Sequence, residues 1–359
     1  MRQRHTSRPV PRPGPGRVAR YLGYLAIALL PACQSGEPDS AFKRYLNQLD
    51  LALSVAVPAI EHVTAAPVPG AGELQLAIPP GDIDGLDFLQ LGSCALQANF
   101  VKRQTRLAQF AKPSQRLLLE LEYLRLAPAC IQRLRDGGRH PLADQLEAAR
   151  REKQGQLPAL IFNATLGSDE YRSFWLAAPI TGEYPRSDSS AAVSALETIN
   201  HQTRRWLSGD YRARNRAFEL LLSEIAGGGG GQKRRAWSRQ VDWLVAADTI
   251  AGQSLASAAV CSAVNVNPMT RRRLALARSY FTGVIQPLAT QSQLHYLEME
   301  APVAALEAQL SAILPPRYRR WLTDRNQHVA ALASAPGQHL AQLDRIQQGC
   351  NTEAGLAAR

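Results

Sequence analysis

Two amphipathic helical patterns follow each other between residues 83 and 134, and each contains one cysteine. Residues of the first recur every three or four positions, which places them on one helix face. Ser93 and Arg103 stand in the same series as its apolar members: Leu86, Leu89, Leu96, Phe100, Leu107 and Phe110. The second stripe consists of Leu117, Leu118, Leu121, Leu124, Ile131 and Leu134. Pro113 separates the patterns, because proline disfavours helix at the preceding residue. The stretch therefore predicts a helical hairpin, with Pro128 kinking or restarting its second helix.

The two cysteines of this hairpin, Cys94 and Cys130, fall in register. Facing residues of an antiparallel pair have a constant index sum, and a turn centred near Lys112 places Cys94 opposite Cys130. That register favours a disulfide, which requires close Cα atoms. The alternative is two buried free thiols, because cysteine is a common core residue.

The N-terminus has the pattern of an export signal. Residues 1–20 contain six arginines and no acid, and residues 21–32 are a short apolar run. A basic segment, about ten apolar residues and then small residues are typical of a secretory signal peptide. The run is shorter than the roughly 20 residues that span a bilayer. Its end, Leu30-Pro31-Ala32-Cys33, is similar to a bacterial lipobox. We therefore expect removal of residues 1–32 and acylation of Cys33; the alternative is an ordinary signal peptide with a chance cysteine.

Acylation of Cys33 makes residues 33–38 a lipid-anchored tether on the periplasmic side of the bacterial envelope. Several acyl chains on one residue anchor a protein stably, where one chain does not. Gln34 follows the cysteine, and the absence of aspartate there favours the outer membrane under the usual sorting rule. The membrane is thus an expected partner, contacted through the N-terminal lipid.

Removal of the signal peptide also changes the charge argument. The whole chain is +11, but without the six arginines of residues 1–32 there remain 35 basic and 30 acidic residues, near +5. The high isoelectric point belongs largely to the removed segment. We therefore expect no nucleic-acid partner.

Four cysteines remain after Cys33: Cys94, Cys130, Cys261 and Cys350. An even number in an oxidising compartment predicts two disulfides, and four cysteines allow three pairings. The hairpin register favours Cys94–Cys130, which leaves Cys261–Cys350. A metal site is not expected, because no two of these cysteines are close in sequence.

The composition and periodicity predict an all-α protein, a multi-helix bundle built on the 83–134 hairpin. No run of alternating β-branched residues is long enough for a sheet. We expect these parts: an N-terminal helical part at 39–226, a flexible glycine joint at 227–231, a C-terminal helical part at 232–350 and a tail at 351–359. The joint could separate two lobes, or the helices on both sides could share one bundle. Helices are expected to stop near Gln156 and to begin at Pro302 and Gly337.

A search for chemistry gives no catalytic residues, no metal site and no cofactor. None of the histidines forms the H-E-x-x-H pattern of zinc proteases. Gly252-Gln253-Ser254-Leu255-Ala256 lacks the last glycine of a serine-nucleophile turn and lies in an expected helix. Glu120 and Glu122 are two positions apart, so on a helix they point in different directions.

Three consecutive arginines, Arg271, Arg272 and Arg273, stand in the first turn of an expected helix. The helix dipole disfavours positive charge there, so these side chains need partners. Salt bridges to other helices are one explanation. Contact with anionic lipid headgroups near the anchor is the sharper hypothesis.

Several short segments resemble the DUF3080 family of uncharacterised proteobacterial proteins, which are often described as lipoproteins. The matching residues are Leu86, Phe88, Leu89, Cys94, Leu96, the segment Pro113-Ser114-Gln115-Arg116-Leu117, Cys130, the segment Asn163-Ala164-Thr165-Leu166-Gly167, Glu170, His328 and Cys350. Arg103-Gln104-Thr105 and Ala108 depart from the family pattern of Arg-Asn-Ser and glycine in the turn before Pro113. The resemblance implies no reaction, because the family has no assigned function.

We expect an envelope interaction or assembly factor with an envelope protein as partner. The alternative is a small-ligand-binding periplasmic lipoprotein, in which a closed pocket with polar groups would surround Asn163, Thr165 or the hairpin. An enzyme is the third candidate and is not favoured, since it would need perturbed carboxylates or a histidine–acid pair in a cleft.

The cysteine pairing is directly testable by a mass-spectrometric disulfide map of the exported protein. We expect links Cys94–Cys130 and Cys261–Cys350, because the hairpin register selects the first pair. A Cys94–Cys261 or Cys94–Cys350 link would overturn the register argument.

Overall fold

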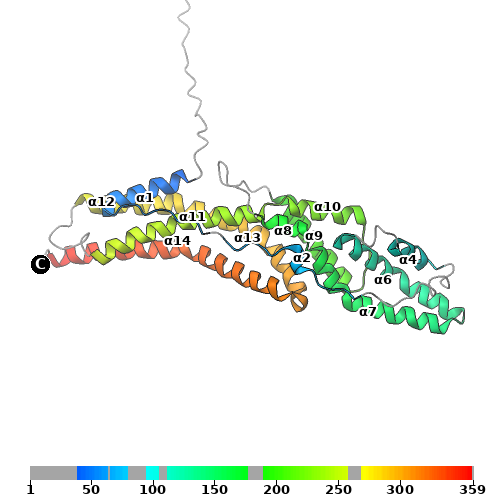
Figure 1. Cartoon of the computed structure of the whole chain (residues 1–359). Helices are drawn as coiled ribbons and strands as arrows, with labels where there is room; N and C mark the ends of the chain where they lie inside the picture. Colours follow the sequence, from blue (N-terminus) through cyan, green and yellow to red (C-terminus); the bar gives the residue numbers. More distant parts are fainter. Residues whose placement is uncertain are drawn as a thin grey trace, which may run out of the picture. The chain divides into compact units, whose positions relative to one another are not determined.

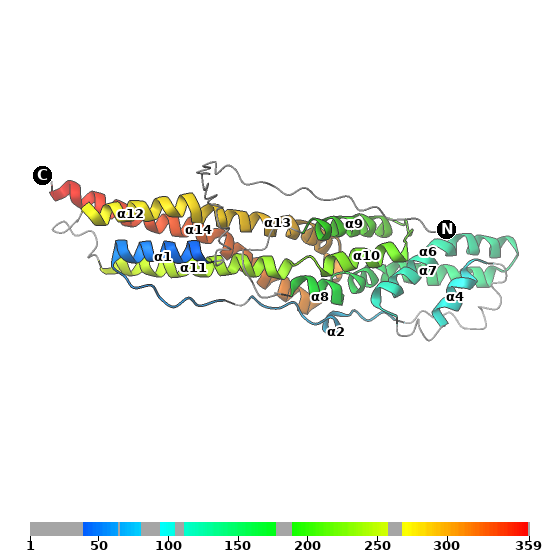
Figure 2. The ribbon, with the colours of Figure 1, turned by 90° about the horizontal axis from the view of Figure 1, so that it is seen from above.

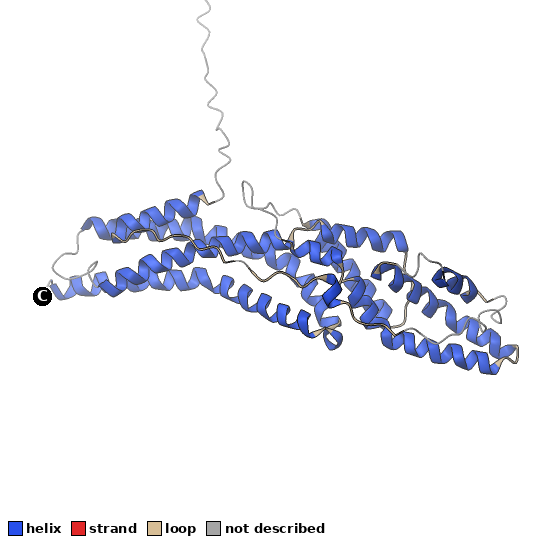
Figure 3. Ribbon diagram, in the orientation of Figure 1, coloured by secondary structure: helices blue, strands red, loops and turns tan. Residues whose placement is uncertain are grey.

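Most of the residues described in the computed structural model are helical (Figure 1, Figure 3). The described residues are 39–63, 65–79, 94–104, 111–176, 189–257 and 268–357. No strand occurs within these ranges, in agreement with the predicted all-α class. The α-helices are α1 (Ser40–Leu53), α2 (Ala71–Leu74), α4 (Leu96–Gln104), α6 (Pro113–Asp136), α7 (His140–Ala164), α8 (Asp169–Trp175), α9 (Ser190–Leu207), α10 (Asn215–Ala226), α11 (Gly230–Ser257), α12 (Pro268–Tyr280), α13 (Gln286–Gln309) and α14 (Pro316–Ala357). Two short elements are the π-turn η1 (Phe281–Ile285) and the 3₁₀ turn η2 (Ser311–Ile313).

Prolines begin several of these helices but do not end them. Pro113 and Pro316 are the first residues of α6 and α14, where a missing N–H costs nothing. The helices also continue through interior prolines, namely Pro128, Pro158, Pro302 and Pro336. The helix breaks expected after Gln156 and at Pro302 and Gly337 are therefore wrong. An interior proline costs a helix about 3 kcal/mol through the lost backbone hydrogen bond and the clash of its ring. Apolar burial around these positions outweighs that cost.

The π-turn η1 adjusts the backbone just before Pro287. A proline ring clashes with the carbonyl four residues earlier, which here is the carbonyl of Gly283 inside η1. Widening one turn to π geometry relieves such a clash. The chain thus passes from α12 to α13 through a π-turn, with Phe281 and Ile285 still buried.

The helices pack as neighbouring pairs around one hydrophobic core, in a unit that spans Gly36–Arg359. α6 packs along α7, to which it is joined by a tight turn at Gly138, whose φ is +74°. α9 contacts α10 and α13, α11 contacts α13 and α14, and α1 lies against α11 and α12 (Figure 2). The two expected helical parts on either side of the glycine run therefore share a core.

A non-helical strap, residues 54–63 and 65–79 with α2 inside it, runs beside α11 (Figure 2). Side chains of the helices hold its backbone. Trp321 Nε1 donates to the Ala66 carbonyl at 3.3 Å, and the amide of Asn163 exchanges two hydrogen bonds with the backbone of Leu76 at 2.8 and 2.9 Å. Backbone groups that lack helical partners are satisfied in this way.

The glycine run 227–231, predicted to be a flexible joint, is a packed turn that leads into α11. Gly229 has a φ of +65°, which a residue with a side chain adopts only with strain. A Cβ on Gly230 would lie 2.5 Å from the ring of Phe174, and one on Gly231 would lie 2.0 Å from the Trp175 carbonyl oxygen. These glycines allow α8 to contact the start of α11.

Replacement of Gly231 by alanine tests this packing. We expect Gly231→Ala to lower the free energy of unfolding by about 2–3 kcal/mol, because the new methyl group overlaps the backbone of Trp175. The matched control is Gly252→Ala in the same helix, where no atom lies within 4 Å of the new methyl. That variant should gain about 0.5–1 kcal/mol. Equal stability of the two variants in urea unfolding would show that the run is not packed as described.

Candidate functional site

An exposed apolar groove lies between α1 and α12. It has a volume of about 490 Å³ and is lined by Gln48, Leu51, Arg273, Leu276, Ser279, Tyr280 and Val284. Leu51 and Leu276 are 61% and 59% exposed, although each belongs to a helix whose other leucines are largely buried. Neighbouring exposed apolar side chains of this kind mark surfaces that bind partners.

Of the three arginines at the start of α12, Arg273 lines this groove. Arg273 Nη1 donates to the Leu51 carbonyl at 3.0 Å, near the end of α1. Arg271 and Arg272 are exposed, and within the described ranges neither makes an ion pair. Salt bridges to other helices therefore do not account for these two arginines in this part of the chain, and the groove has a positive rim.

The most buried ionic group of the described residues joins α8, α13 and α14. Arg325, whose side chain is 0% exposed, binds Glu307 with two hydrogen bonds of 2.8 Å. Tyr318 donates to the same carboxylate at 2.7 Å, and its hydroxyl lies 2.9 Å from that of Tyr171. Burial raises the pKa of Tyr171 and Tyr318, so both remain neutral donors. The two-pronged geometry satisfies both charges, which burial alone would make very unfavourable.

Sequence reasoning did not identify this cluster, because its members are far apart in the chain and none belongs to a motif. Arg325 also lies over the rings of Trp175 and Trp321, with its Cζ 5.5 and 5.2 Å from the ring centroids. All its contacts are internal. The cluster therefore stabilises the core rather than presenting a reactive group.

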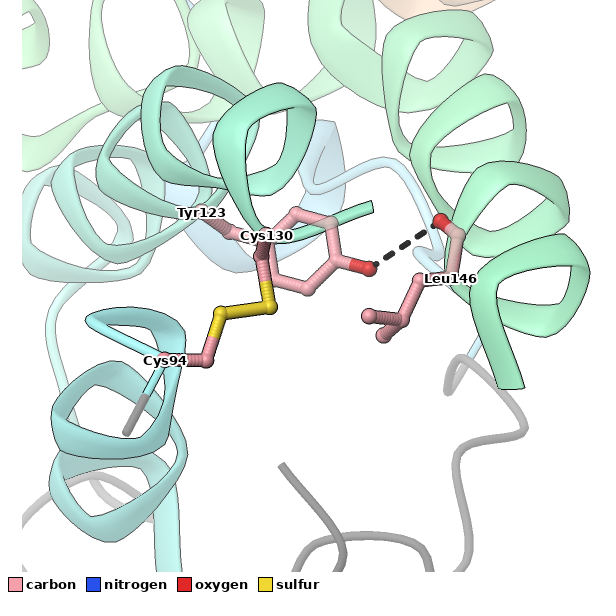
Figure 4. Close-up of a disulfide and its surroundings, with 4 residues drawn as sticks. All are labelled: Cys94, Tyr123, Cys130 and Leu146. Atoms are coloured by element: carbon pink, nitrogen blue, oxygen red, sulfur yellow. Dashed lines mark hydrogen bonds between the residues drawn. A yellow bond between two sulfur atoms is a disulfide. The ribbon is translucent and has the colours of Figure 1, made fainter. Parts of the chain in front are cut away.

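A disulfide joins Cys94 to Cys130, with Cα atoms 5.6 Å apart (Figure 4). This is the pairing that the predicted hairpin register favours. It links the start of α4 to α6, and α4 packs on α6 over the part that is described. Leu86, Leu89, Leu107 and Phe110, which complete the first predicted stripe, lie outside the described residues.

Glu120 of α6 binds a cation from each flanking helix. Arg103 of α4 donates to it at 2.6 and 2.8 Å, and Lys153 of α7 lies 3.1 Å away. Both cations also lie over the Tyr123 ring, whose hydroxyl donates to the Leu146 carbonyl at 3.4 Å (Figure 4). Burial opposes ionisation of Glu120, but hydrogen bonds and charges from Arg103 and Lys153 lower its pKa below the usual 4.5. Arg103, which belongs to the segment that departs from the family pattern, thus has a structural role.

The two segments that carry the family resemblance, 113–117 and 163–167, form hydrogen bonds with other parts of this chain. Ser114 and Gln115 donate to the same oxygen of Glu219 on α10. Asn163 holds Leu76 of the strap as described above, and Thr165 donates to the Ile161 carbonyl at 2.7 Å. Both Asn163 and Thr165 are buried. Their geometry explains how the segments connect helices without requiring a ligand.

Two histidines pair with aspartates. His339 is fully buried, its Nδ1 lies 2.6 Å from Asp248 Oδ1, and its Nε2 meets the Tyr45 hydroxyl. The rings of Tyr45 and Phe281 pack on it at 5.5 and 4.9 Å, as expected for a core residue. His62 of the strap binds Asp242 of α11 at 3.0 Å, beside a separate cavity.

The structure does not describe the side chains of the three other predicted cysteine sites. Cys33 and Cys261 lie in undescribed segments, and Cys350 lies in α14 with its side chain not described. Across the described ranges, no three His, Cys, Asp or Glu side chains are grouped to hold a metal ion. Within the same ranges, every helix is too short or too polar to cross a bilayer.

Comparison with known proteins gives one match. The pattern of a family described as "Protein of unknown function (DUF3080)" matches residues 42–353, most of the chain. Neither the curated proteins nor the solved structures provide a match. The match extends well beyond the short segments that carry the resemblance.

The Glu120 cluster predicts a specific dependence of stability on pH. Because the pKa of Glu120 is lowered on folding, its contribution is present above about pH 4.5 and is lost as the pH falls through the folded value. We expect Glu120→Gln to lower the free energy of unfolding by about 2–3 kcal/mol at pH 7, since it leaves Arg103 and Lys153 unpaired. The deficit should shrink towards pH 3.

Urea unfolding of the oxidised protein at several pH values measures this effect. The control is Glu152→Gln, an exposed position on the same helix as Lys153, which should change the free energy by less than about 0.5 kcal/mol. A deficit for Glu120→Gln that stays constant from pH 7 to pH 3 would exclude the proposed electrostatic role.

Proposed function

The chain belongs to the DUF3080 family, and we propose that it is a lipid-anchored interaction or assembly factor of the bacterial envelope. In this proposal Cys33 is acylated after removal of residues 1–32, and the helical unit stays on the periplasmic side, with the outer membrane favoured. The unit is a bundle built on the 83–134 hairpin, and a second disulfide joins Cys261 to Cys350. The observation that carries the interaction role is the exposed groove between α1 and α12.

The occupant that fits this groove best is an amphipathic helix of an envelope protein. Leu51 and Leu276 offer exposed apolar surface on two adjacent helices, and such grooves bind the apolar face of a partner helix. Arg271, Arg272 and Arg273 add positive charge at one side. Charge complementarity then favours acidic residues on the polar flank of the partner.

The proposed anchor keeps this groove within reach of the membrane. α1 begins at Ser40, and residues 34–39 connect it to Cys33. Six extended residues span at most about 20 Å, because each adds roughly 3.3–3.6 Å. A partner that inserts into or lies on the same membrane can therefore meet α1 and α12.

A site-specific crosslinking experiment in envelopes tests the docking proposal. A photoreactive residue is introduced into the acylated full chain as Leu276→benzoylphenylalanine. The matched control is Leu220→benzoylphenylalanine on α10, where the native leucine is 60% exposed. We expect one discrete protein adduct from position 276, because the groove seats a specific helix, and no such adduct from position 220.

Charge reversal then distinguishes specific docking from a sticky surface. Changing Arg271, Arg272 and Arg273 together to glutamate should reduce the adduct at position 276 by about tenfold. Identical adducts from positions 276 and 220 would contradict the proposal. Adducts that contain only lipid would show that the groove faces the bilayer and would equally defeat a protein partner.

A further inference from the structure

A second, smaller cavity lies where the strap crosses the first part of α11. Its volume is about 170 Å³, and its lining consists of His62, Val63, Ala65, Gly231, Arg234, Arg235, Ser238, Arg239 and Asp242. Ser238 donates to the Val63 carbonyl at 3.5 Å, and Arg234 donates to that of Ala66, so α11 holds the strap over the cavity. This cavity shares no lining residue with the groove between α1 and α12.

The charges around this cavity do not balance. Arg239 is paired with Asp39, the residue before α1, and Asp242 is paired with His62. Arg234 and Arg235 make no ion pair within the described ranges. Arg235 is exposed, so water can solvate it, whereas Arg234 is only 5% exposed. An unpaired buried guanidinium is costly unless something satisfies its remaining N–H groups.

Arg234 has few partners for a buried cation. Its single hydrogen bond to another described residue runs to the Ala66 carbonyl at 3.3 Å, and its guanidinium lies 5.4 Å from the centroid of the Trp175 ring. Burial and the nearby charge of Arg325 both lower its pKa. Its environment therefore favours an anion, which the described residues do not provide.

Two further buried polar atoms near Arg234 are also unsatisfied. The Tyr296 hydroxyl and His328 Nε2 have no hydrogen-bond partner among the described residues. Tyr296 packs on the same Trp175 ring as Arg234, with centroids 6.4 Å apart. Burial lowers the pKa of His328, the charge of Arg234 lowers it further, and Asp242 opposes the shift. Unpaired polar atoms of this kind are uncommon in protein interiors and indicate a missing polar partner.

We propose that the Arg234 cavity binds a small organic carboxylate with an apolar body. A carboxylate matches the planar guanidinium with two parallel hydrogen bonds, and Trp175 fixes the plane of that guanidinium. Val63 and Ala65 provide apolar wall, and the volume is close to that of cavities of about 150 Å³ that hold benzene. The Asp242 carboxylate on the same wall disfavours a doubly charged ligand such as phosphate.

Calorimetric titration of the acylated full chain in detergent tests this site, with detergent alone as the blank. The probes are benzoate, its neutral analogue benzyl alcohol, and inorganic phosphate. We expect saturable binding of benzoate only. Arg234→Gln should weaken that binding roughly 10- to 100-fold, and Arg234→Lys about tenfold, because lysine retains the charge but not the two-pronged geometry. The control Arg204→Gln, at an exposed position on α9, should bind as the parent does.

A thermal readout separates binding from a structural role of Arg234. Benzoate should raise the unfolding midpoint of the parent chain and leave that of Arg234→Gln unchanged. Equal benzoate affinity in the parent and in Arg234→Gln, or no saturable benzoate binding by the parent, overturns the proposal. Tighter binding of phosphate or benzyl alcohol than of benzoate overturns the assigned ligand class. If Arg234→Gln does not fold, the comparison of Arg234→Lys with the parent decides, and an unchanged affinity in that variant rejects the site.

Discussion

The packing of α8, α13 and α14 against one another depends on the buried ion pair between Arg325 and Glu307. Two opposite charges in a protein interior are stable only when each is fully hydrogen-bonded. Glu307 accepts hydrogen bonds from Arg325 and Tyr318, and the Tyr318 hydroxyl is hydrogen-bonded to that of Tyr171. The Arg325 guanidinium lies over two tryptophan rings. Loss of Glu307 removes both 2.8 Å hydrogen bonds from the buried Arg325, and loss of Arg325 leaves Glu307 with hydroxyl donors alone. This mutual dependence fixes how the three helices approach one another.

A second constraint on the packing is the close approach of α8 to the backbone of the glycine run 227–231. Phe174 and Trp175 of α8 occupy the space that side chains on Gly230 and Gly231 would fill. Trp175 is also the ring against which Arg234, Arg325 and Tyr296 lie. A stretch that resembles a linker in composition is thus part of the packed interior, and it helps to place the arginine beside the small cavity.

The two proposed sites have different chemistry and rest on different observations. The groove between α1 and α12 offers exposed leucines and a positive rim, which suit a protein helix. The cavity under the strap has one buried arginine that lacks an ionic partner among the described residues, and it suits a small anion. Because the strap also passes from α1 to α2, a ligand in the cavity would contact the segment that follows the groove-bearing helix.

Features that depend on neighbouring positions could be predicted from the amino-acid sequence. Helical class follows from apolar spacing, and the Cys94–Cys130 disulfide is the pairing predicted from a turn near Lys112. The sequence did not reveal that helices continue through Pro158, Pro302 and Pro336, because tertiary burial decides whether a helix tolerates the lost hydrogen bond. The packing of the glycine run, the binding of the strap by Asn163 and the position of Leu51 and Leu276 in one groove emerge from tertiary contacts. Tertiary contacts also pair Arg325 with Glu307 and leave Arg234 without an ionic partner among the described residues. Such contacts join residues far apart in the chain, so their energy depends on how whole helices fit together, which local spacing does not encode.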